Sequence, residues 1–174
     1  LHYPLRRQRQ MCIRDRMGSG KSSIGYLVSK KLNLEFKDID NLIEIEEKMK
    51  VSKIFEVKGE SYFRDLEEKI TLNSLDSDNT VISLGGGGFI NKKIRKKILT
   101  NHLSFWLNWD EKIILSRIKG SKKRPLAFKS SDQDIKKIIR ERSKIYSTAK
   151  YKINCNKLAK NEIVKKVIKI YELN

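Results

Sequence analysis

Residues 17–23 read Met-Gly-Ser-Gly-Lys-Ser-Ser and lead into a segment with helical periodicity. They supply the end of a phosphate-binding loop, whose full pattern is G-x-x-x-x-G-K-[ST]. Glycines let backbone N–H groups turn toward phosphate oxygens, and the start of a helix adds positive potential there. A glycine turn that carries Lys-Ser by chance is the alternative. The pattern predicts a nucleotide site formed by Gly18, Ser19, Gly20, Lys21, Ser22 and Ser23.

The residues before this loop depart from the pattern. A complete loop has its first glycine five residues before Gly20, where this chain has Asp15. Residues 1–16 are rich in arginine, and only residues 11–13 resemble a strand. They contain no apolar core of the length that a secretory signal needs. We expect residues 1–16 to be a foreign leader that replaces the natural first strand, and residues 17–174 to form a single domain; a basic nucleic-acid arm is the alternative for the leader.

Length and composition narrow the possible classes of protein. The chain has 174 residues, enough for one domain with a proper core. It lacks a run of 18 apolar residues, which argues against a membrane-spanning segment. Two cysteines form no disulfide framework and suit a reducing cytoplasm, and the two histidines share no zinc-ligand spacing with them.

The net charge of +18 invites a nucleic-acid interpretation. Much of the charge is lysine at helix-surface spacing, as in Lys92-Lys93, Lys96-Lys97 and Lys136-Lys137. Such pairs favour a solvated face, and a basic field also attracts a nucleotide or an acidic substrate. We therefore expect neither a nucleic-acid partner nor a membrane partner.

Downstream of the loop, the pattern alternates between strands and helices. Strands are expected at 34–40, 80–84, 103–109 and 151–155. Helices are expected at 21–32, 41–48, 52–58, 60–74, about 91–99, 111–119, 132–147 and 161–172. This alternation predicts a three-layer α/β/α domain with a mainly parallel sheet, and ligands beyond the carboxyl ends of the strands.

Two further motifs follow predicted strands and would share that edge. Asp38 and Asp40 are two residues apart, so on an extended chain their side chains leave the same face. One could hold hydrated Mg²⁺ while the other accepts a proton from a substrate hydroxyl; alternatively, Asp40 caps the next helix. Residues 85–87 are all glycine and allow the backbone to approach a small ligand, or else form a mobile turn.

Five segments together resemble the shikimate kinases in order and spacing. They are Met17-Gly-Ser-Gly-Lys-Ser22, Asp38-Ile-Asp40, Gly59-Glu-Ser-Tyr-Phe-Arg64, Ile82-Ser-Leu-Gly-Gly-Gly87 and Arg124-Pro-Leu126. The resemblance implies a P-loop kinase fold with a five-stranded parallel sheet, a lid and substrate-binding helices. It also implies transfer of the γ-phosphate of ATP to the 3-hydroxyl of shikimate, on the route to chorismate and the aromatic amino acids, with ATP and Mg²⁺ required.

The resemblance assigns roles to individual residues. It implies that the catalytic residues are Lys21, Asp40 and Arg124, with Arg124 in the lid. It implies shikimate contacts from Asp40, Arg64, Gly85, Gly86, Gly87 and Arg142. It implies ATP contacts from Gly18, Ser19, Gly20, Lys21, Ser22, Ser23, Arg117 and Arg124, and metal contacts from Ser22 and Asp38.

The two arginines assigned to the shikimate carboxylate are supported unequally. Arg64 has Glu67 three residues later, on the same helix face, where it could orient the guanidinium. Arg142 is followed by Lys144, where the family usually has proline, which weakens its match. Phe55 and Phe63 match aromatic residues of the pocket wall, with core packing as the alternative.

We therefore expect a monomeric, cytoplasmic shikimate kinase. A related small-molecule kinase, such as a gluconate kinase, is one alternative. It would lack the Arg64 and Arg142 pair and the glycines at 85–87. A basic nucleic-acid binder or a crippled kinase fold is the other.

Overall fold

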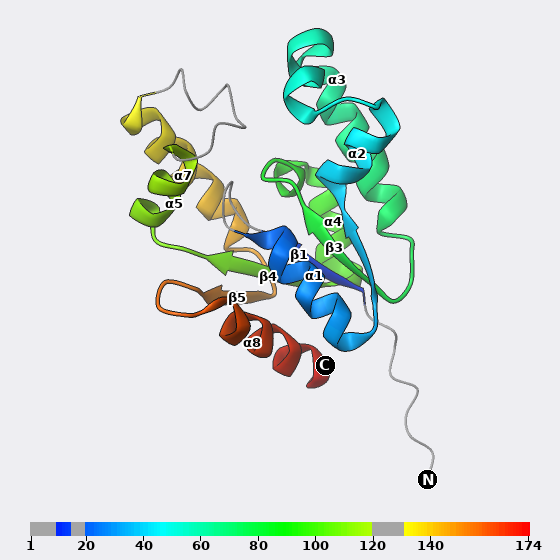
Figure 1. Ribbon diagram of the computed structural model, residues 1–174, viewed down its shortest axis with the longest axis vertical. Coiled ribbons are helices and arrows are strands. Elements are labelled where there is room, and N and C mark those ends of the chain that lie inside the picture. The colour runs from blue at the N-terminus through cyan, green and yellow to red at the C-terminus, as the bar shows by residue number, and fades with distance from the viewer. Residues whose placement is uncertain (1–9, 15–19, 120–130) are drawn as a thin grey trace.

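A computed structural model describes residues 10–14, 20–119 and 131–174 of the chain. One sheet contains five parallel strands in the order β2-β3-β1-β4-β5. The strands are β1 (Met11–Arg14), β2 (Glu35–Asp38), β3 (Thr80–Leu84), β4 (Leu103–Asn108) and β5 (Tyr151–Asn154). Helices cover both faces of this sheet (Figure 1). The predicted three-layer α/β/α class with a five-stranded parallel sheet is confirmed.

Two groups of helices form the outer layers. The helices are α1 (Lys21–Leu32), α2 (Ile39–Glu47), α3 (Val51–Ser74), the 3₁₀ helix η1 (Gly88–Ile90), α4 (Lys92–Asn101), α5 (Glu111–Lys119), α7 (Asp132–Tyr146) and α8 (Lys160–Glu172). Helices α1 and α8 pack on one face of the sheet, and α2, α3 and α4 pack on the other. The alternation of apolar residues along each strand supplies both cores.

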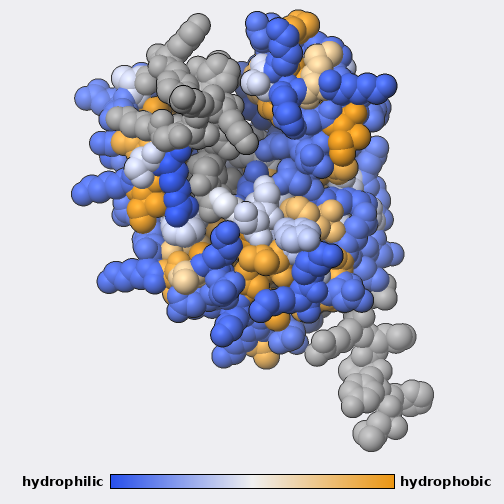
Figure 2. Space-filling model, in the orientation of Figure 1, coloured by the Kyte–Doolittle hydropathy of each residue, from blue (hydrophilic) through white to orange (hydrophobic). Residues whose placement is uncertain are grey.

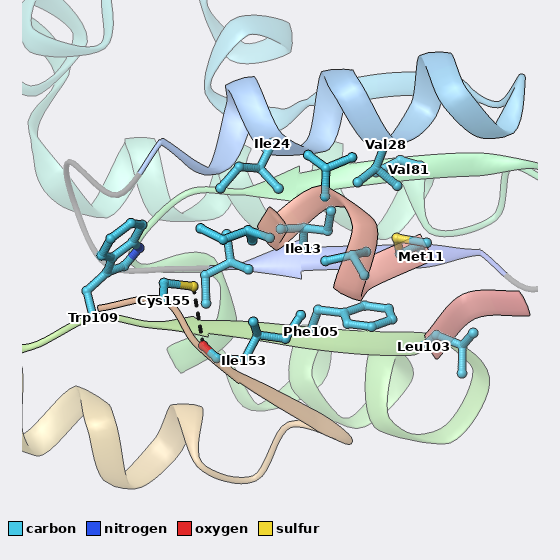
Figure 3. Close-up of a cluster of buried hydrophobic side chains, with 14 of the residues drawn as sticks. Met11, Ile13, Ile24, Val28, Val81, Leu103, Phe105, Trp109, Ile153 and Cys155 are labelled. Atoms are coloured by element: carbon cyan, nitrogen blue, oxygen red, sulfur yellow. Dashed lines mark hydrogen bonds between the residues drawn. The ribbon is translucent and has the colours of Figure 1, made fainter. Parts of the chain in front are cut away.

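The strand β1 occupies the centre of the sheet although only three of its residues are apolar. Met11, Cys12 and Ile13 are fully buried, because β3 and β4 pair with β1 on either side. Met11 and Ile13 lie in the core beneath α1, together with Ile24 and Val28 of that helix (Figure 3). Cys12 points into the opposite core. Residues 11–13, the strand-like part of the leader, thus form most of the central strand, whereas the foreign origin of residues 1–16 stays a prediction.

The strand that was expected over 34–40 ends earlier, and this changes the geometry of the two aspartates. Asp38 is the last residue of β2, and its Oδ1 accepts a hydrogen bond from the backbone N–H of Asn41, at 3.3 Å. This cap starts α2 at Ile39, so Asp40 lies in the first helical turn. The prediction that Asp38 and Asp40 leave the same face of an extended strand is therefore wrong.

Helix α3 contains a break at Gly59. The glycine has φ 82° and ψ 171°, a backbone conformation that favours glycine, and it divides the helix between residues 58 and 60. The two predicted helices, 52–58 and 60–74, are consistent with this break. The second half carries Arg64 and Glu67 toward the carboxyl ends of the strands.

The basic surface is distributed over exposed helix faces. Lys92, Lys93 and Lys96 of α4 are exposed, which agrees with the expected solvated face. On the face drawn in Figure 2, hydrophilic residues surround small groups of hydrophobic ones. None of the helices in the part of the chain that the structure describes is both long and apolar enough to cross a bilayer.

Candidate active site

The candidate site lies at the carboxyl ends of the strands. The sheet has β1 between β3 and β4, so the connection after β1 runs toward β2 on one side, whereas the connection after β3 crosses β1 to reach β4 on the other. Ligands of open parallel sheets bind at such switch points. The start of α1, the turn after β2 and the glycine loop after β3 all belong to this edge (Figure 1). Asp15, Gly18, Ser19 and the predicted lid with Arg124 lie outside the described residues.

The start of α1 is suited to an anion. Gly20 adopts the left-handed conformation with φ 82° and ψ 18°, as a turn into the helix requires. Among the described residues, no side chain caps this terminus, and its first turn carries no carboxylate that would oppose an incoming phosphate. Lys21 follows directly, with Ser22 half-buried and Ser23 exposed beside it.

Lys21 and Asp40 meet across the site. The Lys21 Nζ lies 3.5 Å from the Asp40 Oδ2. The lysine side chain is 12% exposed and the aspartate side chain 37% exposed, so the pair lies at the boundary between protein and solvent. A lysine is a ligand for phosphate and a carboxylate is an acceptor for a hydroxyl proton, so the two groups needed for transfer to a hydroxyl lie side by side. The structure therefore brings together the predicted phosphate-binding lysine and the predicted base.

The oxygen donors near α1 fit Mg²⁺. Asp38 uses Oδ1 to cap α2, and within the described ranges its Oδ2 accepts no hydrogen bond. The Ser22 hydroxyl lies in the first turn of α1. A carboxylate and a hydroxyl are hard ligands, and Mg²⁺ commonly takes only one or two protein ligands beside water and phosphate oxygens. No cluster of three or more His, Cys, Asp or Glu side chains that could hold a metal ion occurs among the described residues.

Arg64 is held by two glutamates on its own helix. Its Nη1 donates to the Glu67 Oε2 at 2.7 Å, and its Nη2 donates to the Glu60 Oε1 at 3.1 Å. The predicted role of Glu67 in orienting Arg64 is consistent with this geometry. The Arg64 side chain remains 35% exposed, so the guanidinium can still reach a ligand.

Glu67 itself is a buried carboxylate. Its side chain is 4% exposed, and burial raises the pKa of the Glu67 carboxyl above its usual range. The Arg64 charge lowers this pKa, the Asp40 charge raises it, and the Arg142 charge lowers it. Glu67 therefore interacts electrostatically with three of the predicted site residues.

Two aromatic rings lie against Arg64. The Phe55 and Phe63 rings pack together with centroids 4.5 Å apart, and the Arg64 Cζ lies 5.8 Å and 5.2 Å from these centroids. Phe63 is buried and Phe55 is half-buried. Both rings therefore pack in the core, and they also shape the surroundings of the guanidinium.

The glycine loop after β3 touches the charged residues of the site. A Cβ on Gly85 would lie 2.6 Å from the Asp40 Oδ1 and 2.8 Å from the Glu67 Oε1. A Cβ on Gly87 would lie 2.0 Å from the Arg64 Nη1. Neither glycine has a positive φ, so close approach, rather than backbone conformation, is what excludes a side chain. The sequence predicts that this loop allows a close approach. In the structure, the side chains of Asp40, Glu67 and Arg64 are the groups that approach it closely.

Helix α7 borders the same loop. The hydroxyl of Tyr146, its last residue, donates a hydrogen bond to the carbonyl oxygen of Gly86. Arg142 lies one turn earlier on α7 and is half-buried. The Arg142 charge lowers the pKa of Glu67, so Arg142 lies within electrostatic range of this buried carboxylate.

Arg117 lies at a different place, above an indole ring. Its Cζ is 4.1 Å from the Trp109 ring centroid, in a cation–π contact. Trp109 is 8% exposed and belongs to the core beneath α1. The ring additionally supports Arg117, the residue predicted to stack on adenine.

Sequence reasoning missed two partners that the structure reveals. Glu60 lies four residues before Arg64, a helical spacing that would have identified it as a second partner. The bond from Tyr146 to Gly86 joins residues 60 positions apart, and no local pattern predicts it.

Comparisons with known proteins identify the family of this chain. The family model of shikimate kinase matches residues 17–172. A shikimate kinase of Sulfurihydrogenibium sp. is 40% identical over 152 residues, which cover 87% of this chain and 91% of the relative. The crystal structure of shikimate kinase from Aquifex aeolicus is 34% identical, has a TM-score of 0.84 and matches 94% of this chain and 96% of its own. The fold also matches shikimate kinase from Acinetobacter baumannii in complex with shikimate, with a TM-score of 0.88 at 24% identity, over 97% of this chain and 95% of that one. Lys21, Asp40 and Arg64, which the structure brings to one glycine loop, thus occur in a chain that belongs to the shikimate kinase family.

Proposed function

We propose that this protein transfers the γ-phosphate of ATP to the 3-hydroxyl of shikimate. The observation that carries the proposal is the arrangement of three side chains around one glycine loop. Lys21 contacts Asp40, Asp40 approaches Gly85, and Arg64 approaches Gly87. A phosphate-binding cation, a proton acceptor and a carboxylate-binding guanidinium are the groups that phosphorylation of a hydroxy acid needs.

Each side chain has a distinct task in this reaction. The Arg64 guanidinium binds the substrate carboxylate, and its ion pair with Glu67 limits how far it can move. Asp40 accepts the proton of the attacking hydroxyl. Lys21, whose Nζ lies 3.5 Å from the Asp40 Oδ2, neutralises phosphate charge. Arg142 is the second cation for the carboxylate, and Arg117 stacks on adenine.

Asp38 and Ser22 would hold Mg²⁺ in this account. The ion, when bound, neutralises phosphate charge and orients the triphosphate for in-line transfer. The two residues supply hard oxygen ligands at the start of α1 and the end of β2. We further propose that the protein acts as a monomer in the cytoplasm, with small molecules as its only partners.

A coupled assay of ADP release tests the proposal. We expect turnover with shikimate and none above background with D-gluconate. Arg64→Ala should lower kcat/KM for shikimate by roughly 30- to 1000-fold, because a charged partner loses its bonds. Arg140→Ala is the matched control, because Arg140 is exposed and pairs with Glu111 on α5.

Two results would contradict the proposal. Turnover with D-gluconate in preference to shikimate would favour the related kinase class. Absence of turnover together with salt-sensitive oligonucleotide binding that ATP does not compete would favour the basic binder.

A further inference from the structure

One hydrogen bond joins two parts of the site that are far apart in the sequence. Tyr146 ends α7, and its hydroxyl donates to the Gly86 carbonyl oxygen. The residue is 1% exposed, and its ring packs against Phe89 and Trp106 at centroid distances of 6.4 and 6.3 Å. This packing gives the hydroxyl a defined position, so the carbonyl it contacts is located relative to α7.

Gly86 lies between the two glycines that touch the charged residues of the site. Its neighbours Gly85 and Gly87 approach Asp40 and Arg64 so closely that neither has room for a Cβ. The other backbone bonds of this loop are local, from Gly88 N–H to the Gly85 oxygen at 3.2 Å and from Ile90 N–H to the Gly87 oxygen at 2.9 Å. The Tyr146 hydroxyl, in contrast, gives the loop a hydrogen bond to α7.

The same helix carries Arg142. Arg142 and Tyr146 are four residues apart, so they lie on one face of α7. The hydrogen bond of Tyr146 therefore also limits how far Arg142 can move from the glycine loop. Because this loop contacts Arg64, the bond limits the distance between Arg142 and Arg64 as well. The distance between the two arginines determines whether both can reach one carboxylate.

We propose that Tyr146 is a positioning residue that sets the spacing between Arg142 and the glycine loop, and so the fit of a carboxylate-bearing substrate. This inference rests on the proposed function. Tyr146 touches neither reactant in this account, so its loss should affect substrate recognition more than the chemical step.

The test compares Tyr146→Phe with Tyr151→Phe. Both variants lose one hydroxyl and keep the ring; the Tyr151 hydroxyl bonds Asn174 at 2.5 Å, on β5 and away from the site. We expect Tyr146→Phe to raise KM for shikimate about tenfold, the effect of losing one hydrogen bond, with the KM for ATP and the kcat changed less than about twofold. Amide exchange at Gly88 and Ile90 should become faster in the free protein, by about the same factor. Tyr151→Phe should change neither quantity.

The outcomes separate this inference from the proposed function. Wild-type protein without shikimate-dependent ADP release would refute the proposed function. An active wild type with an unchanged shikimate KM in Tyr146→Phe would overturn only the positioning role. Unchanged exchange at Gly88 and Ile90 would overturn the positioning role whether or not the wild type is active.

Discussion

Gly87 offers the sharpest perturbation of the substrate site, because the Arg64 guanidinium occupies the space of a side chain. In Gly87→Ala, the new Cβ would lie 2.0 Å from Nη1, 2.6 Å from Cζ and 3.0 Å from Nη2 of Arg64. Contact distances between such atoms are about 3.5 Å or more, so the guanidinium must retreat by roughly 1.5 Å. The Nη1 bond to Glu67 is 2.7 Å long, and a retreat of this size takes it beyond hydrogen-bonding range.

The expected loss follows from that displacement. Arg64 is partly exposed, so it can swing into solvent rather than unfold the protein. A charge-assisted bond to a ligand is worth about 1.5–3 kcal/mol, which predicts a roughly 10- to 150-fold fall in kcat/KM for shikimate. KM for ATP should stay within about twofold, because Lys21 is untouched.

Gly88→Ala is the matched control, one residue further along the chain. Its Cβ would lie 3.4 Å from the Glu67 Oε1 and 3.7 Å from the Leu84 Cδ2, close to ordinary contact. The assay is steady-state ADP release at saturating ATP, with thermal unfolding to show that both variants fold. Wild-type shikimate kinetics in Gly87→Ala, or equal losses in the two variants, would refute this reasoning.

Three further predictions concern other parts of the site. Asp40→Asn should lower kcat by about 10²–10⁴, while Asp38→Asn should raise the Mg²⁺ requirement; a magnesium titration with the opposite pattern would reverse these roles. Burial raises the pKa of Glu67 above 4.5, the value of a free carboxyl. The folded wild-type protein therefore loses stability as the pH rises above 4.5 and Glu67 becomes harder to keep protonated. Glu67→Gln cannot ionise, and its free energy of unfolding relative to wild type should therefore increase from pH 4.5 toward neutral; urea unfolding that shows a constant difference would contradict this. Arg117→Ala should weaken ATP binding by roughly 2- to 30-fold, because the guanidinium that Trp109 supports no longer stacks on adenine; unchanged calorimetric affinity would exclude Arg117 from the adenine site.

The alternation of strands and helices was predictable because each element has a periodic apolar pattern. Strand β3 runs Thr80–Leu84 and helix α1 runs Lys21–Leu32, as their patterns predict. The ion pair of Arg64 and Glu67 was predictable for the same reason, since three residues separate neighbours on a helix face.

The remaining features depend on contacts that local patterns do not contain. Periodicity could not show that Asp38 caps α2, and so it placed Asp40 on the wrong kind of element. A glycine run indicates close approach but not which atoms approach, and here they belong to Asp40, Glu67 and Arg64. Three apolar residues among charged ones also look too short for a central strand, and only their pairing with β3 and β4 explains the burial of residues 11–13.

The most direct test of the central claim is the position of the phosphate in the product. The protein, ATP, Mg²⁺ and shikimate are incubated together, and the product is analysed by proton–phosphorus correlation NMR. Our account predicts one ADP for each shikimate consumed and a phosphorus coupled to the proton on carbon 3 of the ring. A phosphorus coupled at another carbon, or ADP release that does not depend on shikimate, would contradict it.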